Sequence, residues 1–194
     1  MNGPVDDPPQ IDWLPASDLG DGRPGRIGMT VLPGKRGPSV RYPGRVYRAD
    51  LDRDLTSLRN AGVMRLILLV EDGELARWSD PELVERAAGF GLEIRRYPMP
   101  DGLPPGSTAD MDEILRSVAE TRSDADVAVA CMGGVGRTGT VAACALVAAG
   151  WDVAAAIARV RELRHPTAVE TDAQERFVQT YWSERGSGSA TVSP

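Results

Sequence analysis

Residues 127–139, with the sequence VAVACMGGVGRTG, decide the fold of this chain. The segment begins with an apolar run of strand length that ends in Cys131, and it continues through a glycine-rich turn. An Ala-rich run follows, which Gly150 closes, and it is apolar on nearly all sides, which predicts a buried helix. A strand that leads directly into a buried helix is typical of an α/β fold with a largely parallel sheet.

The same alternation extends outward from this segment in both directions. The pattern predicts strands over 26–32, 46–49, 65–70, 92–97 and 127–130, and helices over 52–61, 79–89, 107–122, 152–163 and 171–184. We therefore expect a central, mostly parallel twisted sheet of about five strands, flanked by helices. The strand before Cys131 should be central, with the site at its carboxyl end, where ligands of such sheets bind.

The two ends of the chain depart from this pattern. Residues 1–25 carry many Pro, Gly and Asp residues without a period, which predicts an irregular N-terminal arm. The ending GSGSATVSP, residues 186–194, predicts a flexible C-terminal tail. One domain is expected over residues 26–185, since a chain of 194 residues suits a single domain of ordinary size.

The composition excludes several classes of partner. Lys and Arg number 22 against 28 Asp and Glu, for a formal charge of −6, so a nucleic-acid surface is not expected. The chain shows no signal peptide and no apolar run of membrane-spanning length, so no membrane contact is expected. Two cysteines and the single His165 supply no ligand spacing for a metal, and we expect no cofactor. The expected compartment is the cytoplasm, and the sequence carries no signal for an oligomeric state.

The turn between Cys131 and Arg137 has the composition of an anion site. Its three glycines let successive backbone N–H groups turn inward, and the following helix start adds unpaired donors. Arg137 can hold two phosphate oxygens in a bidentate fork. The same positive field favours the thiolate form of Cys131, which is a nucleophile. The alternative interpretation is a glycine-rich strand-to-helix turn with a buried cysteine.

Residues 131–138 resemble the C-x5-R-S/T signature of cysteine-dependent protein tyrosine phosphatases, and they are most similar to the dual-specificity branch near the kinase-associated phosphatase type. The likeness extends from about Ile27 to Phe177. Its weaker pieces are LPGK at 32–35, the stretch 50–54, PMPDG at 98–102 and ETDAQ at 170–174. The resemblance implies hydrolysis of phosphomonoesters through a thiophosphate on Cys131. The substrate would be a phosphorylated protein, carrying phosphotyrosine and also phosphoserine or phosphothreonine, or a small phosphomonoester.

The resemblance assigns roles to the residues of the signature. The phosphate-binding positions would be Met132, Gly133, Gly134, Val135, Gly136 and Arg137. Thr138 would donate a hydrogen bond to the Cys131 sulfur and help it leave in the second step. Because the variable positions of the turn hold no Lys or Arg, phosphoproteins are favoured over highly charged inositol phosphates.

Asp101, in the PMPDG loop, is the residue that the resemblance makes the general acid for the leaving group. Pro-Asp-Gly is also ordinary turn chemistry, and Asp110 and Asp112 are rivals that look like residues of a first helical turn. Gln174 stands where relatives often place a glutamine that orients the hydrolytic water. Thr171 and Gln174 also form a capping-box pattern, so both interpretations remain open.

One position departs from the family. Relatives usually carry His immediately before the nucleophile, where it helps to hold the loop and tune the thiolate, and this chain has Ala130. A second hypothesis therefore stands beside the enzyme, namely a pseudophosphatase that binds phosphorylated partners with little or no turnover.

Overall fold

A five-stranded sheet forms the centre of the computed structural model, which describes residues 8–39 and 43–188. The strand order is β1-β2-β7-β5-β6, with bounds Asp12–Leu14 (β1), Ile27–Val31 (β2), Asp126–Cys131 (β7), Val63–Leu68 (β5) and Glu93–Arg96 (β6). β1 pairs antiparallel with β2, and every other neighbouring pair is parallel. The predicted sheet is confirmed, with β7 in its middle and Cys131 at the carboxyl end of that strand.

One predicted member of the sheet is wrong. The segment 46–49 forms β4 (Val46–Arg48), which pairs with β3 (Arg36–Pro38) in a separate two-stranded hairpin. The fifth strand of the central sheet is instead β1. The remaining predicted strands agree with the structure to within two residues at each end.

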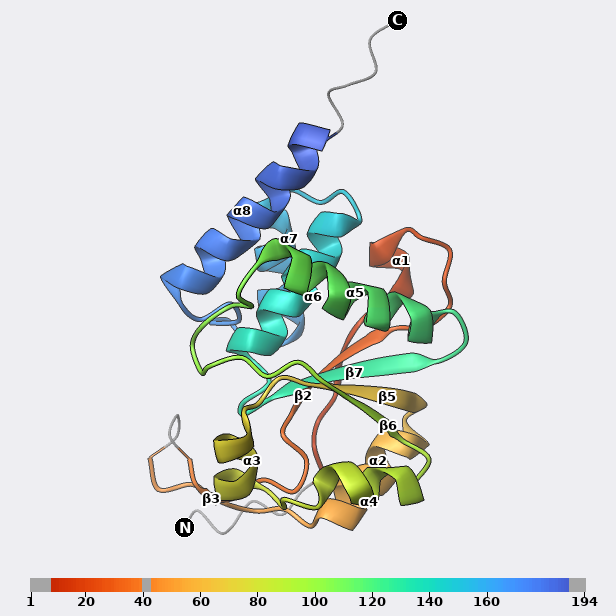
Figure 1. Cartoon of the computed structure of the whole chain (residues 1–194), viewed down its shortest axis with the longest axis vertical. Helices are drawn as coiled ribbons and strands as arrows, with labels where there is room; N and C mark the ends of the chain where they lie inside the picture. The colour runs from red at the N-terminus through yellow and green to blue at the C-terminus, as the bar shows by residue number, and fades with distance from the viewer. Residues whose placement is uncertain (1–7, 40–42, 189–194) are drawn as a thin grey trace, which may run out of the picture.

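Helices cover both faces of the sheet (Figure 1). One face carries α1 (Ala16–Leu19), α5 (Thr108–Arg122), α6 (Gly136–Ala148), α7 (Val153–Leu163) and α8 (Asp172–Gly188); the other carries α2 (Leu51–Asn60), α3 (Asp72–Trp78) and α4 (Leu83–Gly89). Ser107 and Asp152, the first residues of two predicted helices, cap α5 and α7, since each side chain accepts a hydrogen bond from a backbone amide of the first turn. The helix predicted over 79–89 starts later, at Leu83.

Two apolar cores flank the sheet, and β7 contributes alternate residues to each. Val127, Val129 and Cys131 face the core beneath α5–α8, whereas Ala128 and Ala130 face the core beneath α2–α4. This is the period-two alternation of a strand buried on both faces. Cys131 therefore emerges on the side of the sheet that carries α6.

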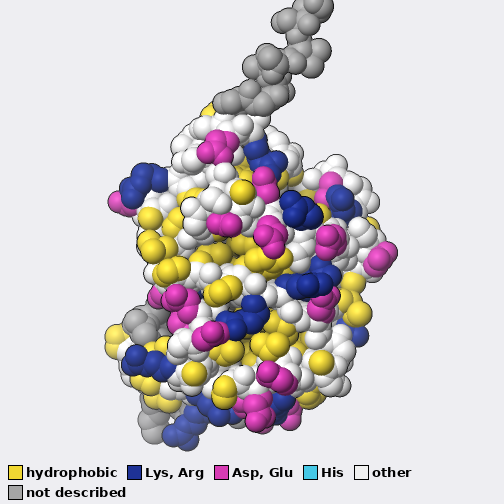
Figure 2. Space-filling model, viewed as in Figure 1, with side chains coloured by type: hydrophobic (Ala, Val, Ile, Leu, Met, Phe, Trp, Pro, Cys, Tyr) yellow, Lys and Arg dark blue, Asp and Glu magenta, His cyan; other side chains and the backbone are white. Residues whose placement is uncertain are grey.

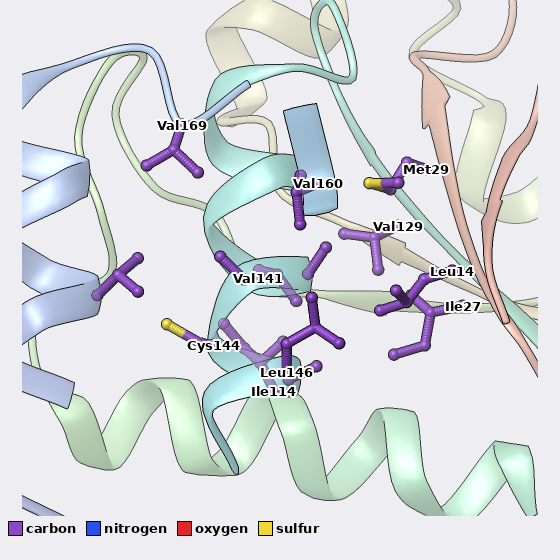
Figure 3. Close-up of a cluster of buried hydrophobic side chains, with 14 of the residues drawn as sticks. Leu14, Ile27, Met29, Ile114, Val129, Val141, Cys144, Leu146, Val160 and Val169 are labelled. Atoms are coloured by element: carbon purple, nitrogen blue, oxygen red, sulfur yellow. The ribbon is translucent and has the colours of Figure 1, made fainter. Parts of the chain in front are cut away.

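Helix α6 is buried along nearly its whole length, as its apolar sequence predicts. Every residue from Gly136 to Val147 is buried. Figure 3 shows part of this core, in which Val141 and Cys144 of α6 lie among side chains from the sheet and the neighbouring helices. A rigid, fully packed helix therefore follows the glycine-rich turn and holds it against the sheet.

The described parts of both chain ends contain regular structure. The arm expected to be irregular over 1–25 contains β1 and α1, and the first of these belongs to the central sheet. The tail expected from residue 186 is still helical to residue 188. Residues 1–7 and 189–194 lie outside the described residues, so the division into arm, domain and tail stays a prediction.

The surface carries charges of both signs. Figure 2 shows acidic and basic side chains interspersed across the face viewed. The structure contains ion pairs between such groups, for example Arg65 with Glu93 at 2.8 Å. Within residues 8–39 and 43–188, none of the helices combines the length and the apolar character needed to cross a bilayer.

Candidate active site

The glycine-rich turn predicted to hold phosphate, here called the cradle loop (residues 131–137), joins the end of β7 to the start of α6. Gly134 has a φ of 66°, and a Cβ there would lie 2.3 Å from the backbone oxygen of Thr30 on β2. A Cβ at Gly136 would lie 2.6 Å from a carboxylate oxygen of Glu170. Glycine is therefore required at position 134, where φ is positive and the backbone of β2 is in the way, whereas a side chain at position 136 would have to displace the Glu170 carboxylate.

The thiol of Cys131 lies beneath this loop and is 3% exposed. Burial raises its pKa, but the charge of Arg137, the hydroxyl and amide of Thr138 and the amide of Val135 together lower it below the ordinary value. The net result favours the thiolate, as the positive field of a helix start predicts. Cys144 is the opposite case, since burial raises the pKa of its thiol.

Arg137 is 1% exposed, and its guanidinium is held from the α3 side of the sheet. Its two terminal nitrogens bind the carboxylate of Glu74 at 2.6 and 2.7 Å, and one of them also donates to the carbonyl of Met99 at 3.0 Å. Burial opposes ionisation of Glu74, but the hydrogen bonds from Arg137 outweigh it and lower the pKa of the carboxyl. The Nε of Arg137 is buried and has no hydrogen-bond partner among the described residues, so one donor of the fork stays available to a ligand.

Asp101 reaches the same guanidinium from the PMPDG loop. Its carboxylate lies 2.9 Å from Nη2 of Arg137, and its side chain is 79% exposed. The loop is anchored by Thr171, whose hydroxyl donates to the carbonyl of Gly102 at 2.8 Å. The two rivals from the sequence lie on α5, and Asp112 there accepts a hydrogen bond from Tyr181 at 2.6 Å. The geometry thus brings Asp101 to the cradle loop.

Gln174 combines the two interpretations that the sequence left open. Its backbone amide donates to the Thr171 hydroxyl at 3.2 Å, and its side-chain oxygen accepts from the Glu170 amide at 2.8 Å, so it does help to cap α8. The side chain is fully buried, and its Nε2 has no hydrogen-bond partner among the described residues. That nitrogen lies 3.1 Å from where a Cβ of Gly136 would stand, so it is directed at the cradle loop.

The site contains a cavity of about 650 Å³, and Gln174 and Thr138 are not among the residues that line it. Cys131, Arg137 and Asp101 line it together with Glu74 and Glu170. His165 is half-buried and also lines this cavity. In the described part of the chain, no group of three or more His, Cys, Asp or Glu side chains is arranged to hold a metal ion.

Sequence reasoning gave no role to three charged residues of the site, Glu74, Lys35 and Arg164, although Lys35 lies in the LPGK stretch that belongs to the resemblance. Glu74 belongs to α3, which was not predicted, and its signal was the pairing with Glu71 in a capping box. Lys35 donates to the carbonyl of Met132 at 3.0 Å from the segment that follows β2. Arg164 binds two further carbonyls of the loop from the end of α7. A Lys or Arg in a sequence usually indicates only a solvated surface, so neither cation stood out.

The chain is similar to known proteins over most of its length. Cyclin-dependent kinase inhibitor 3 of Rattus norvegicus is 29% identical over 205 residues, which cover 98% of this chain and 91% of that protein. The Homo sapiens protein of that name is 26% identical over 203 residues, with the same coverage of 98% and 91%.

Solved structures give the same result for the fold. A kinase associated phosphatase with serine in place of its catalytic-site cysteine matches with a TM-score of 0.81 at 23% identity, over 94% of this chain and 98% of that one. Tk-PTP in its active form matches with a TM-score of 0.66 at 29% identity, over 82% of this chain and 92% of that one. The α/β architecture is therefore that of protein tyrosine phosphatases.

A family profile described as "Polymorphic toxin system, DSP-PTPase phosphatase" matches residues 43–151, which is more than half of the chain and includes the whole cradle loop. The resemblance noted in the sequence is thereby confirmed. The chain belongs to this DSP-PTPase phosphatase family, within the dual-specificity branch of the cysteine-dependent protein tyrosine phosphatases.

Proposed function

We propose that this chain hydrolyses phosphomonoesters through a covalent thiophosphate intermediate on Cys131. The observation that carries the proposal is a buried thiol beside a buried guanidinium, with Cys131 3% and Arg137 1% exposed. Glu74 balances the charge of the guanidinium, and the unpartnered Nε of Arg137 and the amides of the cradle loop remain available as donors to an anion. The lowered pKa of Cys131 supports its role as the nucleophile.

In the first step, the Cys131 sulfur attacks phosphorus and the bond from phosphorus to the leaving oxygen breaks. Arg137 and the amides of the cradle loop hold the equatorial oxygens, whose charge these donors stabilise. Asp101 gives its proton to the leaving oxygen. The exposure of its side chain supports this role, because a leaving group must depart toward solvent.

In the second step, water attacks the phosphorus of the thiophosphate and the sulfur leaves. Asp101, now ionised, takes a proton from the water, and the Gln174 carboxamide orients that water. The unpartnered Nε2 of Gln174 beside Gly136 supports the assignment. Thr138, at the start of α6, stabilises the departing thiolate through its hydroxyl and amide, which already lower the pKa of Cys131.

The proposed substrate is a phosphorylated protein. The cavity of about 650 Å³ is large enough to receive a phosphorylated side chain, and Tyr47 and Trp78 add aromatic surface to its walls. The names of the relatives, cyclin-dependent kinase inhibitor 3 and kinase associated phosphatase, refer to kinases, which supports a phosphoprotein substrate for this chain. We place the reaction in the cytoplasm, where a thiolate nucleophile stays reduced.

The competing function is that of a pseudophosphatase, which Ala130 keeps open. An aryl phosphate separates the two functions. The wild-type chain should release the phenol, and Cys131→Ser should lose at least about a thousandfold in turnover while its thermal unfolding stays unchanged. Cys144→Ala is the matched control, because it removes the other thiol and should retain turnover.

A phosphopeptide panel completes the test. If wild-type and Cys131→Ser chains bind phosphopeptides equally and neither releases phosphate, the chain is a binding module and the proposed reaction is wrong. Release of phosphate by the wild type from phosphotyrosine and phosphothreonine peptides would define the dual specificity directly.

A further inference from the structure

Three consecutive carbonyl groups of the cradle loop each accept a hydrogen bond from a cation. Nζ of Lys35 lies 3.0 Å from the oxygen of Met132. Arg164 spans the next two, with Nη2 3.1 Å from the oxygen of Gly133 and Nε 2.8 Å from the oxygen of Gly134. Charge-assisted hydrogen bonds of this kind are about twice as strong as neutral ones, so these contacts hold the loop firmly.

These carbonyls determine where the amides of the loop point. In a trans peptide the C=O and the following N–H are antiparallel, and the described residues contain no cis peptide bond. A cation on the oxygen of Gly134 therefore directs the N–H of Val135 the opposite way. That N–H is one of the groups that lower the pKa of the Cys131 thiol. The same relation holds for the two preceding peptides.

Arg164 is itself fixed in place. It follows α7 directly as the cap residue, and its remaining nitrogen Nη1 binds the carboxylate of Asp12 on β1 at 2.6 Å. The two side chains are only 11% and 17% exposed. A Cβ at Gly134 would lie 2.7 Å from Nη2 of Arg164, which shows how closely the guanidinium covers the loop. β1 thus reaches the site through this ion pair.

Lys35 is held equally well on the other side of the loop. It is 9% exposed, and its ammonium lies 4.1 Å from the centre of the Tyr47 ring, within range of a cation–π contact. Ala130, in contrast, faces the core beneath α2–α4 with a methyl group alone, so the residue before the nucleophile offers the loop no side-chain hydrogen bond. Lys35 and Arg164 hold the loop instead, through their hydrogen bonds to its carbonyl groups.

We propose that Lys35 and Arg164 are positioning residues, which fix the amides of Gly133, Gly134 and Val135 so that these donate to the Cys131 sulfur and to the phosphate. Asp12 keeps Arg164 in register. The inference rests on the proposed function, because it assigns the two cations a part in that reaction without contact to the reacting atoms.

Charge alone would also make a cation lower the pKa of a nearby thiol, so the test must separate charge from orientation. Besides Lys35 and Arg164, the charged and titratable groups that share the cavity with Cys131 are Arg137, Arg45, Glu74, Asp101, Glu170, Asp12, His165 and Tyr47. Arg164→Lys keeps the charge of the site. A lysine ammonium cannot, however, bind two carbonyls and a carboxylate in the planar arrangement of a guanidinium.

The experiment measures the rate of Cys131 alkylation by iodoacetamide against pH, together with kcat and KM for an aryl phosphate. Arg164→Lys should raise the alkylation pKa by about one unit and lower kcat roughly tenfold, because one oriented donor is lost. Arg159→Lys is the matched control, since Arg159 lies on the same helix and pairs with Asp18 at 2.8 Å away from the loop. It should change neither quantity.

Two further variants keep the test decisive if Arg164→Lys unfolds. Asp12→Asn should raise the alkylation pKa in the same direction by a smaller amount, and Lys35→Met should do so through the other end of the loop. If the alkylation pKa of Cys131 is lowered in the wild type and stays the same in all three variants, the inference is overturned and the proposed function is left intact. The opposite result is also informative. If the wild-type chain does not hydrolyse the aryl phosphate but the alkylation pKa of Cys131 rises in the variants, the positioning role is supported and the proposed function is overturned.

Discussion

The carboxylate of Glu74 binds both terminal nitrogens of Arg137, at 2.6 and 2.7 Å. Glu74 has a second task, because its carboxylate also accepts the backbone N–H of Glu71 at 3.0 Å and so caps α3. The short helix α3 therefore carries the group that sets the direction of the Arg137 fork. A bidentate pair fixes both the position and the plane of a guanidinium, which one hydrogen bond does not.

Glu74→Gln should weaken the site without changing any residue of the cradle loop. The amide can accept one hydrogen bond from Arg137, but its NH₂ group opposes the second donor, so the fork loses its fixed plane. We expect kcat/KM for an aryl phosphate to fall by about tenfold or more. The free energy of unfolding should fall by about 3 kcal/mol, because the variant leaves a buried cation incompletely paired. Equal activity of the variant and the wild type would show that Arg137 orients itself.

Local sequence patterns predicted the centre of this molecule because its parts are contiguous. The strand, turn and helix of residues 127–150 follow one another without interruption, and burial on all sides made both elements apolar. The caps at Ser107 and Asp152 are equally local. The alternation of strands and helices along the chain also predicts parallel pairing in the sheet, because two parallel neighbouring strands need a crossover connection, which is usually a helix.

The contacts that shape the site are not local, and they were missed for that reason. Glu74 and Arg137 are separated by 63 residues, and Lys35 and the carbonyl of Met132 by 97. β1 is only three residues long, and its pairing with β2 determines it more than its own composition does. A short element whose partners lie elsewhere in the chain leaves no periodic signal.

Asp101→Asn should separate good leaving groups from poor ones. Asparagine keeps the shape of the loop and cannot donate an acidic proton, so an alkyl phosphate should lose about 10²- to 10⁴-fold in kcat/KM. A nitrophenyl phosphate, whose phenolate leaves without a proton, should lose much less. The measurement is kcat/KM across a series of phosphates with graded leaving-group pKa. Asp110→Asn serves as control, and an equal loss over the whole series would argue against Asp101 as the acid.

Because of Asp21, we expect the protein to lose stability in acid, and this effect is independent of phosphate hydrolysis. Its carboxylate accepts hydrogen bonds from both terminal nitrogens of the buried Arg122, at 2.7 and 3.1 Å. Partial burial opposes its ionisation, but the bonds from Arg122 and from the Arg23 amide outweigh this and lower the pKa of Asp21 from 3.8 to about 2. A lowered pKa adds stability above the unfolded value and loses it as the pH falls from about 4 to about 2.

The check is the free energy of unfolding against pH. Asp21→Asn should flatten part of the decline between about pH 4 and pH 2, because that carboxyl no longer takes up a proton on unfolding. Glu162→Gln is the control, since Glu162 is 69% exposed and pairs only with its helix neighbour Arg159 among the contacts described. If Asp21→Asn leaves the pH dependence of the free energy of unfolding unchanged, other carboxylates are responsible for the acid sensitivity.

Substitution of Gln174 tests whether this one side chain both stabilises the fold and assists hydrolysis of the thiophosphate. Gln174→Ala removes the bond to the Glu170 amide, which should cost about 1 kcal/mol of stability. If the carboxamide also orients the water, attack on the thiophosphate becomes slow, and rapid mixing with an aryl phosphate should show a burst of phenol near one equivalent. Gln179→Ala, on the exposed face of the same helix, should show no such burst. Lower stability in Gln174→Ala with unchanged single-turnover and steady-state rates would reduce Gln174 to a capping residue. The water would then need another partner, and the carboxylate of Glu170 beside Gly136 is the candidate.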